Sequence, residues 1–402
     1  MKRLTTVLLL LLTVTLWGQG TWTFDGQVRH RFERMNVDFN KDTKAQSVNL
    51  LRSRLGFKYQ NGENLYGYIQ IQDARVWGEE GSTLFDGDAD NMDFHQAYVK
   101  IRNLLGLPIT MKLGRMEVKY GNERFFGDVN FYQNGQSFDG VIFKYKGERY
   151  KIDIFNLKET EAFNFGDLGD KNVLGIYSHL DLFKDYKTQL FLFNDRQEYA
   201  RNLNRFTVGF YAAGEQGDLK HTTEFAYQLG RINGLDVSAY MFALNIGYKL
   251  SNMSYNPEIW GGIDYLSGDD DATDANYNTF NTLYADNHKF YGYMDYFFNI
   301  PGNTFGAGLM DIHVKVAFEP IEKMNAIIKF HNFQAAKDIT LLNGDKSKTY
   351  GNEIDFKIKY PANDQVVFKA GYSIFMPGNI FKDYRGDDTS NWFYLMTVVN
   401  LN

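Results

Sequence analysis

Hydrophobic and polar residues alternate with a period of two along most of this chain. Between Trp22 and Glu33 the even-numbered positions are mostly aromatic or aliphatic, and the odd-numbered positions are polar or charged. The same alternation recurs in the segments 51–59, 150–154, 205–212, 240–249, 311–319 and 353–360. Because successive side chains of a β-strand point to opposite sides, each segment is predicted to be a strand with one apolar and one polar face.

Counting such segments to the C-terminus gives about eighteen strands, with sixteen as the alternative. Their connections alternate in length. The short ones are predicted at residues 60–63, 105–108, 147–148, 182–185, 214–218 and 361–364, and the long polar ones at 36–46, 77–93, 120–136, 158–172, 268–308, 337–348 and 377–391. This layout is typical of an antiparallel up-and-down barrel with short periplasmic turns and long extracellular loops.

The N-terminus predicts export. Lys2 and Arg3 precede an apolar run, residues 4–16, and small residues follow at Gly18 and Gly20. This order is typical of a secretory signal peptide, which we assign to residues 1–20 with cleavage after Gly18 or Gly20. An ordinary buried N-terminal helix is the alternative. No cysteine follows the apolar run, which excludes lipoprotein processing.

A soluble all-β protein would show the same alternation, so other features must decide. Aromatic residues crowd the ends of the apolar faces, the loop lengths alternate regularly, and the leader supplies export. We therefore predict an all-β transmembrane β-barrel over residues 21–402. In hydrocarbon every backbone N–H and C=O must pair within the protein, which requires the sheet to close. The first strand begins directly after the leader, which leaves no room for an N-terminal plug domain.

Composition narrows the function classes. The mean hydropathy is −0.41, too low for several helical membrane spans, and the absence of Cys excludes thiol chemistry. A net charge of −6 gives no reason to expect nucleic acid as a partner. No phosphate-binding loop or nucleophile elbow appears, and we expect no cofactor and no catalytic residues. An outer-membrane enzyme built on histidines near the rim, and a purely structural barrel, are the alternatives from other classes.

Basic residues concentrate on the polar faces of the first strands, whereas acids concentrate in the predicted outer loops. A basic wall in a confined aqueous channel would attract anions, and guanidinium groups suit carboxylates. The opposing interpretation is that these cations only pair with Asp25, Glu33, Glu353 and Asp355 across strands. The predicted pore-lining cations are Arg29, Arg31, Arg52, Arg54, Lys58, Lys100, Arg102, Lys112, Arg115 and Arg124.

For two of these cations, Arg115 and Arg124, the alternation alone does not place the side chain in the lumen. By parity Arg115 falls on the lipid face, so we predict either a bulge at Gly114 that turns Arg115, Glu117 and Lys119 inward, or a strand end. Arg124 lies in the following loop, which is rich in aromatic residues. That loop, residues 120–136, either folds into the lumen as a constriction or caps the rim; the sequence leaves both open.

Aspartates cluster in the predicted outer loops at residues 77–93 and 268–274. Carboxylates are the ligands of Ca²⁺, but the spacing is not that of an EF-hand. We therefore interpret them as solvated loop acids and expect no metal site. For His288 a packing role in its loop is favoured over chemistry.

Three blocks of sequence carry a further signal. They read KLGRMEVKYGNERFFG at 112–127, NGQSFDGVIF at 134–143, and YLSGDDD with TFNTLYADNHKFYGYMDYF at 265–297. In this order they resemble the motifs of the alginate export family of outer-membrane barrels, although Met116 stands where that family has Gln. The matching positions, besides Arg115 and Arg124, are Gly114, Tyr120, Gly121, Ser137, Phe138, Asp139, Ser267, Gly268, Asp269, Thr279, Phe280, His288, Gly292 and Asp295.

The resemblance implies an eighteen-stranded barrel whose electropositive lumen lets an anionic polysaccharide or acidic oligosaccharide pass the cell outer membrane passively. The expected partners are that saccharide, outer-membrane lipid and lipopolysaccharide, with periplasmic export machinery as a further candidate. A general or uptake porin for other small solutes is the alternative. The sequence does not decide the direction of transport.

Overall fold

The computed structural model describes residues 20–79, 92–161, 169–182, 184–198, 202–271 and 273–401. The predicted signal peptide, residues 1–20, therefore lies outside the described residues except for its last position. The loop acids Glu80, Asp86, Asp88 and Asp90 lie outside them as well.

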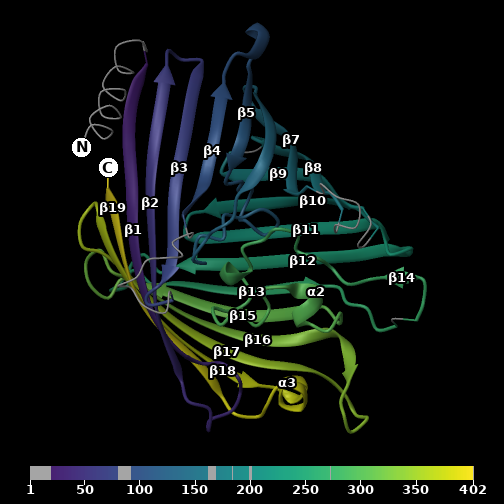
Figure 1. Cartoon of the computed structure of the whole chain (residues 1–402). Coiled ribbons are helices and arrows are strands. Elements are labelled where there is room, and N and C mark those ends of the chain that lie inside the picture. Colours follow the sequence, from purple (N-terminus) through teal and green to yellow (C-terminus); the bar gives the residue numbers. More distant parts are fainter. Residues whose placement is uncertain are drawn as a thin grey trace.

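Nineteen strands form one sheet, and eighteen of them close into an antiparallel barrel (Figure 1). The two-residue strand β14 only adds a parallel pairing to β12, and closure comes from β1 pairing with β19. The predicted fold is confirmed with eighteen strands, and the sixteen-strand alternative is wrong. The strands are β1 (Thr21–Asn36), β2 (Gln46–Asn61), β3 (Leu65–Val76), β4 (Met92–Ile101), β5 (Ile109–Met116), β6 (Phe138–Lys146), β7 (Tyr150–Thr160), β8 (Lys171–Leu180), β9 (Tyr186–Gln197), β10 (Leu203–Gln216), β11 (Leu219–Ile232), β12 (Leu235–Lys249), β13 (Glu258–Leu266), β14 (Asn276–Tyr277), β15 (Leu309–Phe318), β16 (Asn325–Thr340), β17 (Lys346–Pro361), β18 (Val366–Pro377) and β19 (Ser390–Leu401).

The connections divide the barrel into two ends. At the turn end, where β1 begins and β19 finishes, the connections are short; the longest two are 102–108 and 250–257. At the loop end lie the long connections, with three short exceptions at 198–202, 233–234 and 341–345. The predicted loop at 337–348 is therefore shorter than expected, because β16 and β17 continue their pairing to Thr340 and Lys346.

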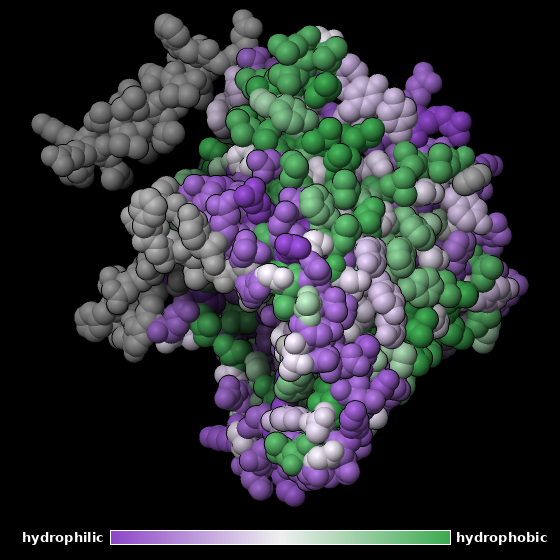
Figure 2. All heavy atoms as spheres, turned by 90° about the vertical axis from the view of Figure 1, so that its right-hand side faces the viewer, coloured by the Kyte–Doolittle hydropathy of each residue, from purple (hydrophilic) through white to green (hydrophobic). Residues whose placement is uncertain are grey.

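The two faces of the barrel wall differ as the alternation requires. Large apolar side chains such as Phe24, Leu55, Ile176, Phe242 and Ile312 are exposed on the outside. Figure 2 shows such hydrophobic side chains gathered over a broad part of the visible surface, with hydrophilic residues grouped beside them. The intervening positions point inward, where many polar side chains are buried. The wall thus presents apolar surface to lipid and polar groups to the lumen.

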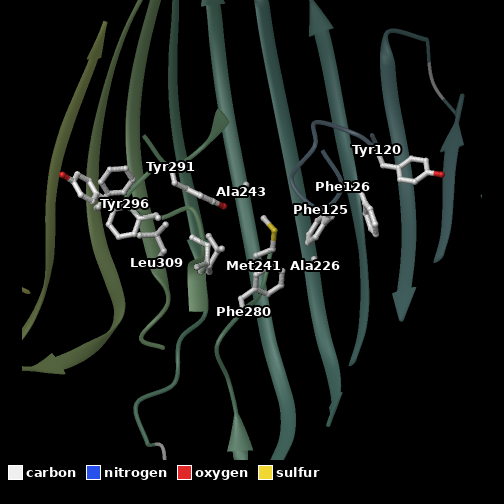
Figure 3. Close-up of a cluster of buried hydrophobic side chains, with 14 of the residues drawn as sticks. Tyr120, Phe125, Phe126, Ala226, Met241, Ala243, Phe280, Tyr291, Tyr296 and Leu309 are labelled. Carbon is white, nitrogen blue, oxygen red and sulfur yellow. The ribbon is translucent and has the colours of Figure 1, made fainter. Parts of the chain in front are cut away.

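Two loop-end connections occupy the interior. We call residues 117–137 the first inner segment and residues 267–308 the second inner segment. Their aromatic residues pack with inward side chains of the wall into a buried hydrophobic cluster that includes Phe125, Phe126, Phe280 and Met241 (Figure 3). A lumen of eighteen strands is too wide for wall side chains to fill, and the inner segments fill much of it.

In the part of the chain that the structure describes, helices are few and short. Helix η1 (Leu104–Gly106) lies in a turn, η2 (Asn287–Lys289) and α2 (Ile300–Asn303) lie in the second inner segment, and α3 (Asn379–Tyr384) lies between β18 and β19. Within the described ranges, no helix has both the length and the hydrophobicity to cross a bilayer.

A β-bulge is present, but not at Gly114. Both pairings of β5 run without a register shift, whereas β4 carries an extra residue opposite Gln70 and Ile71 of β3. That extra residue is His95, whose side chain is buried inside the barrel. Gly114 instead has φ of 125°, and a Cβ there would lie 2.2 Å from the carbonyl oxygen of Ala97.

Replacing Gly114 with alanine is therefore expected to destabilise the barrel by about 1–3 kcal/mol, because the new Cβ meets the backbone of β4 and the φ angle suits only glycine. Denaturant unfolding followed by tryptophan fluorescence measures the change. Gly62→Ala, where φ is also positive but no atom lies within 4 Å, separates the clash from the backbone effect. An equal loss in both variants would contradict the close approach to Ala97.

Candidate channel and its constriction

Arginines on β1 and β2 hold the first inner segment inside the lumen. Arg29 donates to the carbonyl oxygens of Asn130 at 2.5 Å and Tyr132 at 3.0 Å. Arg52 reaches the same two carbonyl oxygens at 3.4 and 3.5 Å. These positions lie near the middle of their strands, so the loop 120–136 folds into the lumen and does not cap the rim.

A second set of contacts fixes Phe131 and the start of the first inner segment. Arg31 donates to the carbonyl oxygen of Phe131, and its guanidinium lies 4.3 Å from the centre of that ring. His95, aimed inward by the bulge, lies 2.8 Å from Glu117 and 2.9 Å from the guanidinium of Arg54. The bulge in β4 therefore places the His95 side chain where it contacts Glu117, the first residue of this segment.

Arg124 is the most deeply buried cation of the first inner segment. Its guanidinium donates to Glu224 of β11 at 2.9 Å and to Asp264 of β13 at 2.7 Å, and it lies 4.0 Å from the ring centre of Phe290. Burial alone would disfavour the charged form, but Asp264, Tyr291 and Glu224 outweigh it and raise the pKa of Arg124 above its ordinary value. Arg124 thus joins the first inner segment to the opposite wall.

The second inner segment is anchored to β16 and β17. The backbone N–H of Met294 donates to Glu353 at 2.9 Å, and Lys329 donates to the carbonyl oxygen of Phe290 at 3.0 Å. Gly292 lies between these anchors with φ of 82°, where a Cβ would meet the Glu353 carboxylate at 2.4 Å. A side chain at position 292 would clash with the Glu353 carboxylate, which explains why this position holds a glycine.

Phe131 and Tyr293, one from each inner segment, line two neighbouring cavities. The cavity toward the loop end has a volume of about 260 Å³ and includes Met35 and Val37 in its lining; the cavity toward the turn end has about 440 Å³ and includes Gln27 and Val398. Between Phe131 and Tyr293 lies the ring of His288, with its centre 4.0 Å from Phe131 and 5.1 Å from Tyr293. We assign this aromatic stack as the constriction.

The turn-end cavity is strongly basic. Its lining contains Arg29, Arg52, Lys119, Lys289, Lys357, Lys359 and Lys369 against Glu123, Asp128 and Asp286, seven cations against three carboxylates. Lys119 bonds Asp128 at 2.8 Å, and Lys289 bonds Glu123 and Asp286, so the acids are already neutralised. Burial would raise the pKa of Asp128, but Lys119 outweighs it and holds that pKa below its usual range.

Three lysines of this cavity remain without an acidic partner. Lys359 and Lys369 face each other across β17 and β18, and Lys357 lies 4.6 Å from the ring centre of Tyr293. Among the residues that the structure describes, none of the three has a carboxylate in ion-pair range. They present uncompensated positive charge to the turn-end cavity, on the turn-end side of the constriction.

The predicted pore-lining cations separate into groups. Arg29, Arg31, Arg52 and Arg54 face the lumen, as predicted, but they bind the first inner segment. Lys58 pairs with Asp25 at 2.6 Å, and Lys100 and Lys112 lie over the rings of Tyr66 and Tyr98. Arg102 is exposed in a turn, where it donates to the carbonyl oxygen of Glu63. The prediction that Arg102 lines the pore wall is wrong because β4 ends one residue earlier.

Arg115 also does not line the pore. It lies at the last but one position of β5, and its guanidinium pairs with Asp139 at 2.8 Å and Asp93 at 3.5 Å, both on the outside. Without a bulge in β5, parity holds and the side chain points outward near the loop end. The strand-end alternative was correct, and Glu117 and Lys119 still enter the lumen because the first inner segment turns inward after Met116.

The other motif positions support the two inner segments. Tyr120 stacks on Tyr177 and donates to Asp153 at 3.0 Å, and Gly121 has φ of 60° beside the Tyr177 hydroxyl. Ser137 lies 3.3 Å from His95, and Phe138 is buried against Phe126. Ser267 bonds the backbone of Tyr240 and Asn278, Gly268 approaches Ala307, and Asp295 lies 3.0 Å from His288.

The described acids of the 269–274 loop have partners of their own. Asp269 and Asp271 accept backbone N–H groups of the same loop, Asp270 pairs with Lys337 at 3.0 Å, and Asp274 binds Asn276. These contacts shape a loop turn at the rim.

Sequence reasoning missed the lysines of the far strands and the role of His95. Lys357, Lys359 and Lys369 stand at inward positions of an alternating pattern, so parity applied to the last strands would have found them. No comparable sequence signal marks His95, because its inward position depends on the bulge.

A model of the alginate export family matches residues 21–394. The chain belongs to the alginate export family. None of the curated proteins matches it.

Solved structures share the fold at low sequence identity. OccK11 (OpdR) of Pseudomonas aeruginosa is 12% identical with a TM-score of 0.61, and 94% of this chain and 96% of that chain are covered. OccAB4 of Acinetobacter baumannii is 12% identical with a TM-score of 0.63 over 95% and 98%. The outer membrane protein OprD from Pseudomonas aeruginosa is 11% identical with a TM-score of 0.61 over 94% of each. Family and fold together identify an outer-membrane channel.

Proposed function

We propose that this alginate export family member is a passive channel for anionic saccharides, which cross the outer membrane through the basic turn-end cavity. The observation that carries the proposal is the set of unpaired lysines, Lys357, Lys359 and Lys369, on the turn-end side of the constriction. A uronate unit carries one carboxylate, and an ammonium in a confined aqueous space attracts it as a point charge.

The cavity also suits a sugar ring. Tyr293 and Tyr394 line it beside the lysines, and both present an apolar ring face together with a polar hydroxyl. Hydrogen bonds and ring contacts of this kind are weak one by one, so a solute can bind and leave, as conduction requires.

Replacing Lys357, Lys359 and Lys369 together with glutamine is expected to abolish most of the anion preference of the channel and to weaken block by an oligouronate, because the uncompensated charge of the cavity is gone. Reversal potentials in planar bilayers under a KCl gradient measure the anion preference, and the channel current at a fixed voltage, with and without the oligouronate, measures the block. The matched control replaces Lys41, Lys44 and Lys346, which are exposed at the loop end of the barrel, with glutamine. Unchanged selectivity in the cavity variant would remove these lysines from the solute path.

A general or uptake porin for other small solutes is the second candidate, and the shared fold with OprD and the Occ proteins favours it. The same bilayer experiment separates the two. A saccharide channel is blocked by the charged oligouronate and not by a neutral oligosaccharide of equal length, whereas a general porin conducts ions in the presence of either.

A further inference from the structure

A group of buried histidine and aspartate side chains lies in the wall of the barrel, outside the basic cavity. Asp311 and His313 point inward from β15, and His331 points inward from β16. His313 and His331 are directly opposed in the register of the two strands. All three side chains are buried, and His331 and Asp311 have no exposed surface.

Both imidazoles turn the same nitrogen toward one carboxylate. His313 Nδ1 lies 3.1 Å from Asp311 Oδ2, and His331 Nδ1 lies 2.9 Å from Oδ1 and 2.8 Å from Oδ2. One ligand atom from each of the three residues lies within 4.8 Å of the other two. Ligand atoms that lie about 2.0–2.2 Å from a metal are roughly 3 Å apart, and the two imidazole–carboxylate separations are of that size.

The outer nitrogens face oxygen atoms as well. His313 Nε2 lies 2.8 Å from Asn245 Oδ1, and His331 Nε2 lies 3.7 Å from Asp355 Oδ2. Among the described residues, neither His331 Nε2 nor Asp355 Oδ2 has a hydrogen-bond partner, although both are buried. His313 therefore has an oxygen atom within hydrogen-bond distance of both ring nitrogens, whereas a neutral imidazole has only one N–H to offer.

A dication resolves this mismatch of protons. With a metal bound to the two Nδ1 atoms and Asp311, each imidazole carries its proton on Nε2. His313 then donates this proton to Asn245, and that of His331 points toward the unpartnered Asp355 Oδ2. Such outer-shell acceptors are the usual companions of metal-binding histidines.

We propose that Asp311, His313 and His331 form a binding site for one divalent first-row transition metal. Of the three residues, His313 lines a cavity of about 340 Å³ together with Asn245 and Lys329, and an ion would enter from that side. The proposal does not depend on which solute the channel conducts.

The test uses the full barrel in detergent, freed of metal by a chelator and then titrated with Zn²⁺ in competition with a chromophoric chelator. One Zn²⁺ per barrel is expected. His313→Ala and His331→Ala are expected to lose this stoichiometric binding, and Asp355→Ala to weaken it about 10- to 100-fold through the lost outer-shell contact. Substitution with Co²⁺ should give the absorption spectrum of a site with nitrogen and oxygen ligands.

The matched control is His179→Ala, which removes another inward histidine, one that contacts Gln189 at 3.1 Å. It should retain full binding. If either alanine variant fails to fold, as judged by heat-modifiable mobility on gels, Asp311→Asn keeps the side-chain shape and replaces it. The proposal is overturned if the wild type binds no Zn²⁺ stoichiometrically, or if folded variants at His331 or Asp311 bind it as tightly as wild type does.

Discussion

Replacing Tyr293 with alanine is expected to raise the single-channel conductance severalfold. Tyr293 lines both the loop-end and the turn-end cavity, and its ring covers His288 on the side opposite Phe131. Removing the ring would merge the two cavities into one wider aqueous path. The double variant with Phe131→Ala should conduct still more, because it removes the partner ring from the other inner segment.

Single-channel recording in planar bilayers measures this effect. Tyr372→Ala is the matched control, since it truncates the same residue type on the lipid face of β18, where the ring is exposed. Its conductance should equal that of the wild type. A Tyr293→Ala channel with wild-type conductance would show that the ion path runs elsewhere.

Replacing Arg124 with alanine is expected to destabilise the folded barrel by about 3–5 kcal/mol, because Glu224 and Asp264 would remain buried without their counter-charge. The first inner segment would also lose its link to β11 and β13. Denaturant unfolding in detergent or lipid measures the loss of stability.

Two further variants test the reason for this loss. Arg115→Ala removes an arginine whose ion pairs are solvent-exposed, and it should cost about 1 kcal/mol or less. Combining Arg124→Met with Glu224→Gln and Asp264→Asn removes all three charges together and should recover much of the stability. A triple variant no more stable than Arg124→Ala would contradict the assignment of the cost to unpaired carboxylates.

The wall of the barrel could be predicted from the sequence because each strand carries its own period-two signal. Trp22 to Glu33 shows its two faces without reference to any other part of the chain. The same parity placed Arg29 and Arg52 inside, and it would have placed Arg115 outside had no bulge been assumed. Parity is local information, and it held wherever the pairing register was regular.

The interior could not be predicted in the same way. The choice between a lumen constriction and a rim cap depends on contacts between residues far apart in sequence, such as Arg29 with Asn130 and Arg124 with Asp264. The predicted filter arginines proved to be anchors, because backbone carbonyl groups folded into the lumen need donors. The uncompensated charge is instead that of lysines on the last strands. That they lack a carboxylate in ion-pair range depends on the three-dimensional arrangement, which the sequence does not give.

The most direct test of the account is the reversal potential of the wild-type channel in a planar bilayer with a KCl gradient. Uncompensated positive charge at Lys357, Lys359 and Lys369 predicts a potential of the sign that reports chloride as the more permeant ion. A potential of the opposite sign, reporting potassium as the more permeant ion, would contradict the basic lumen as the basis of transport.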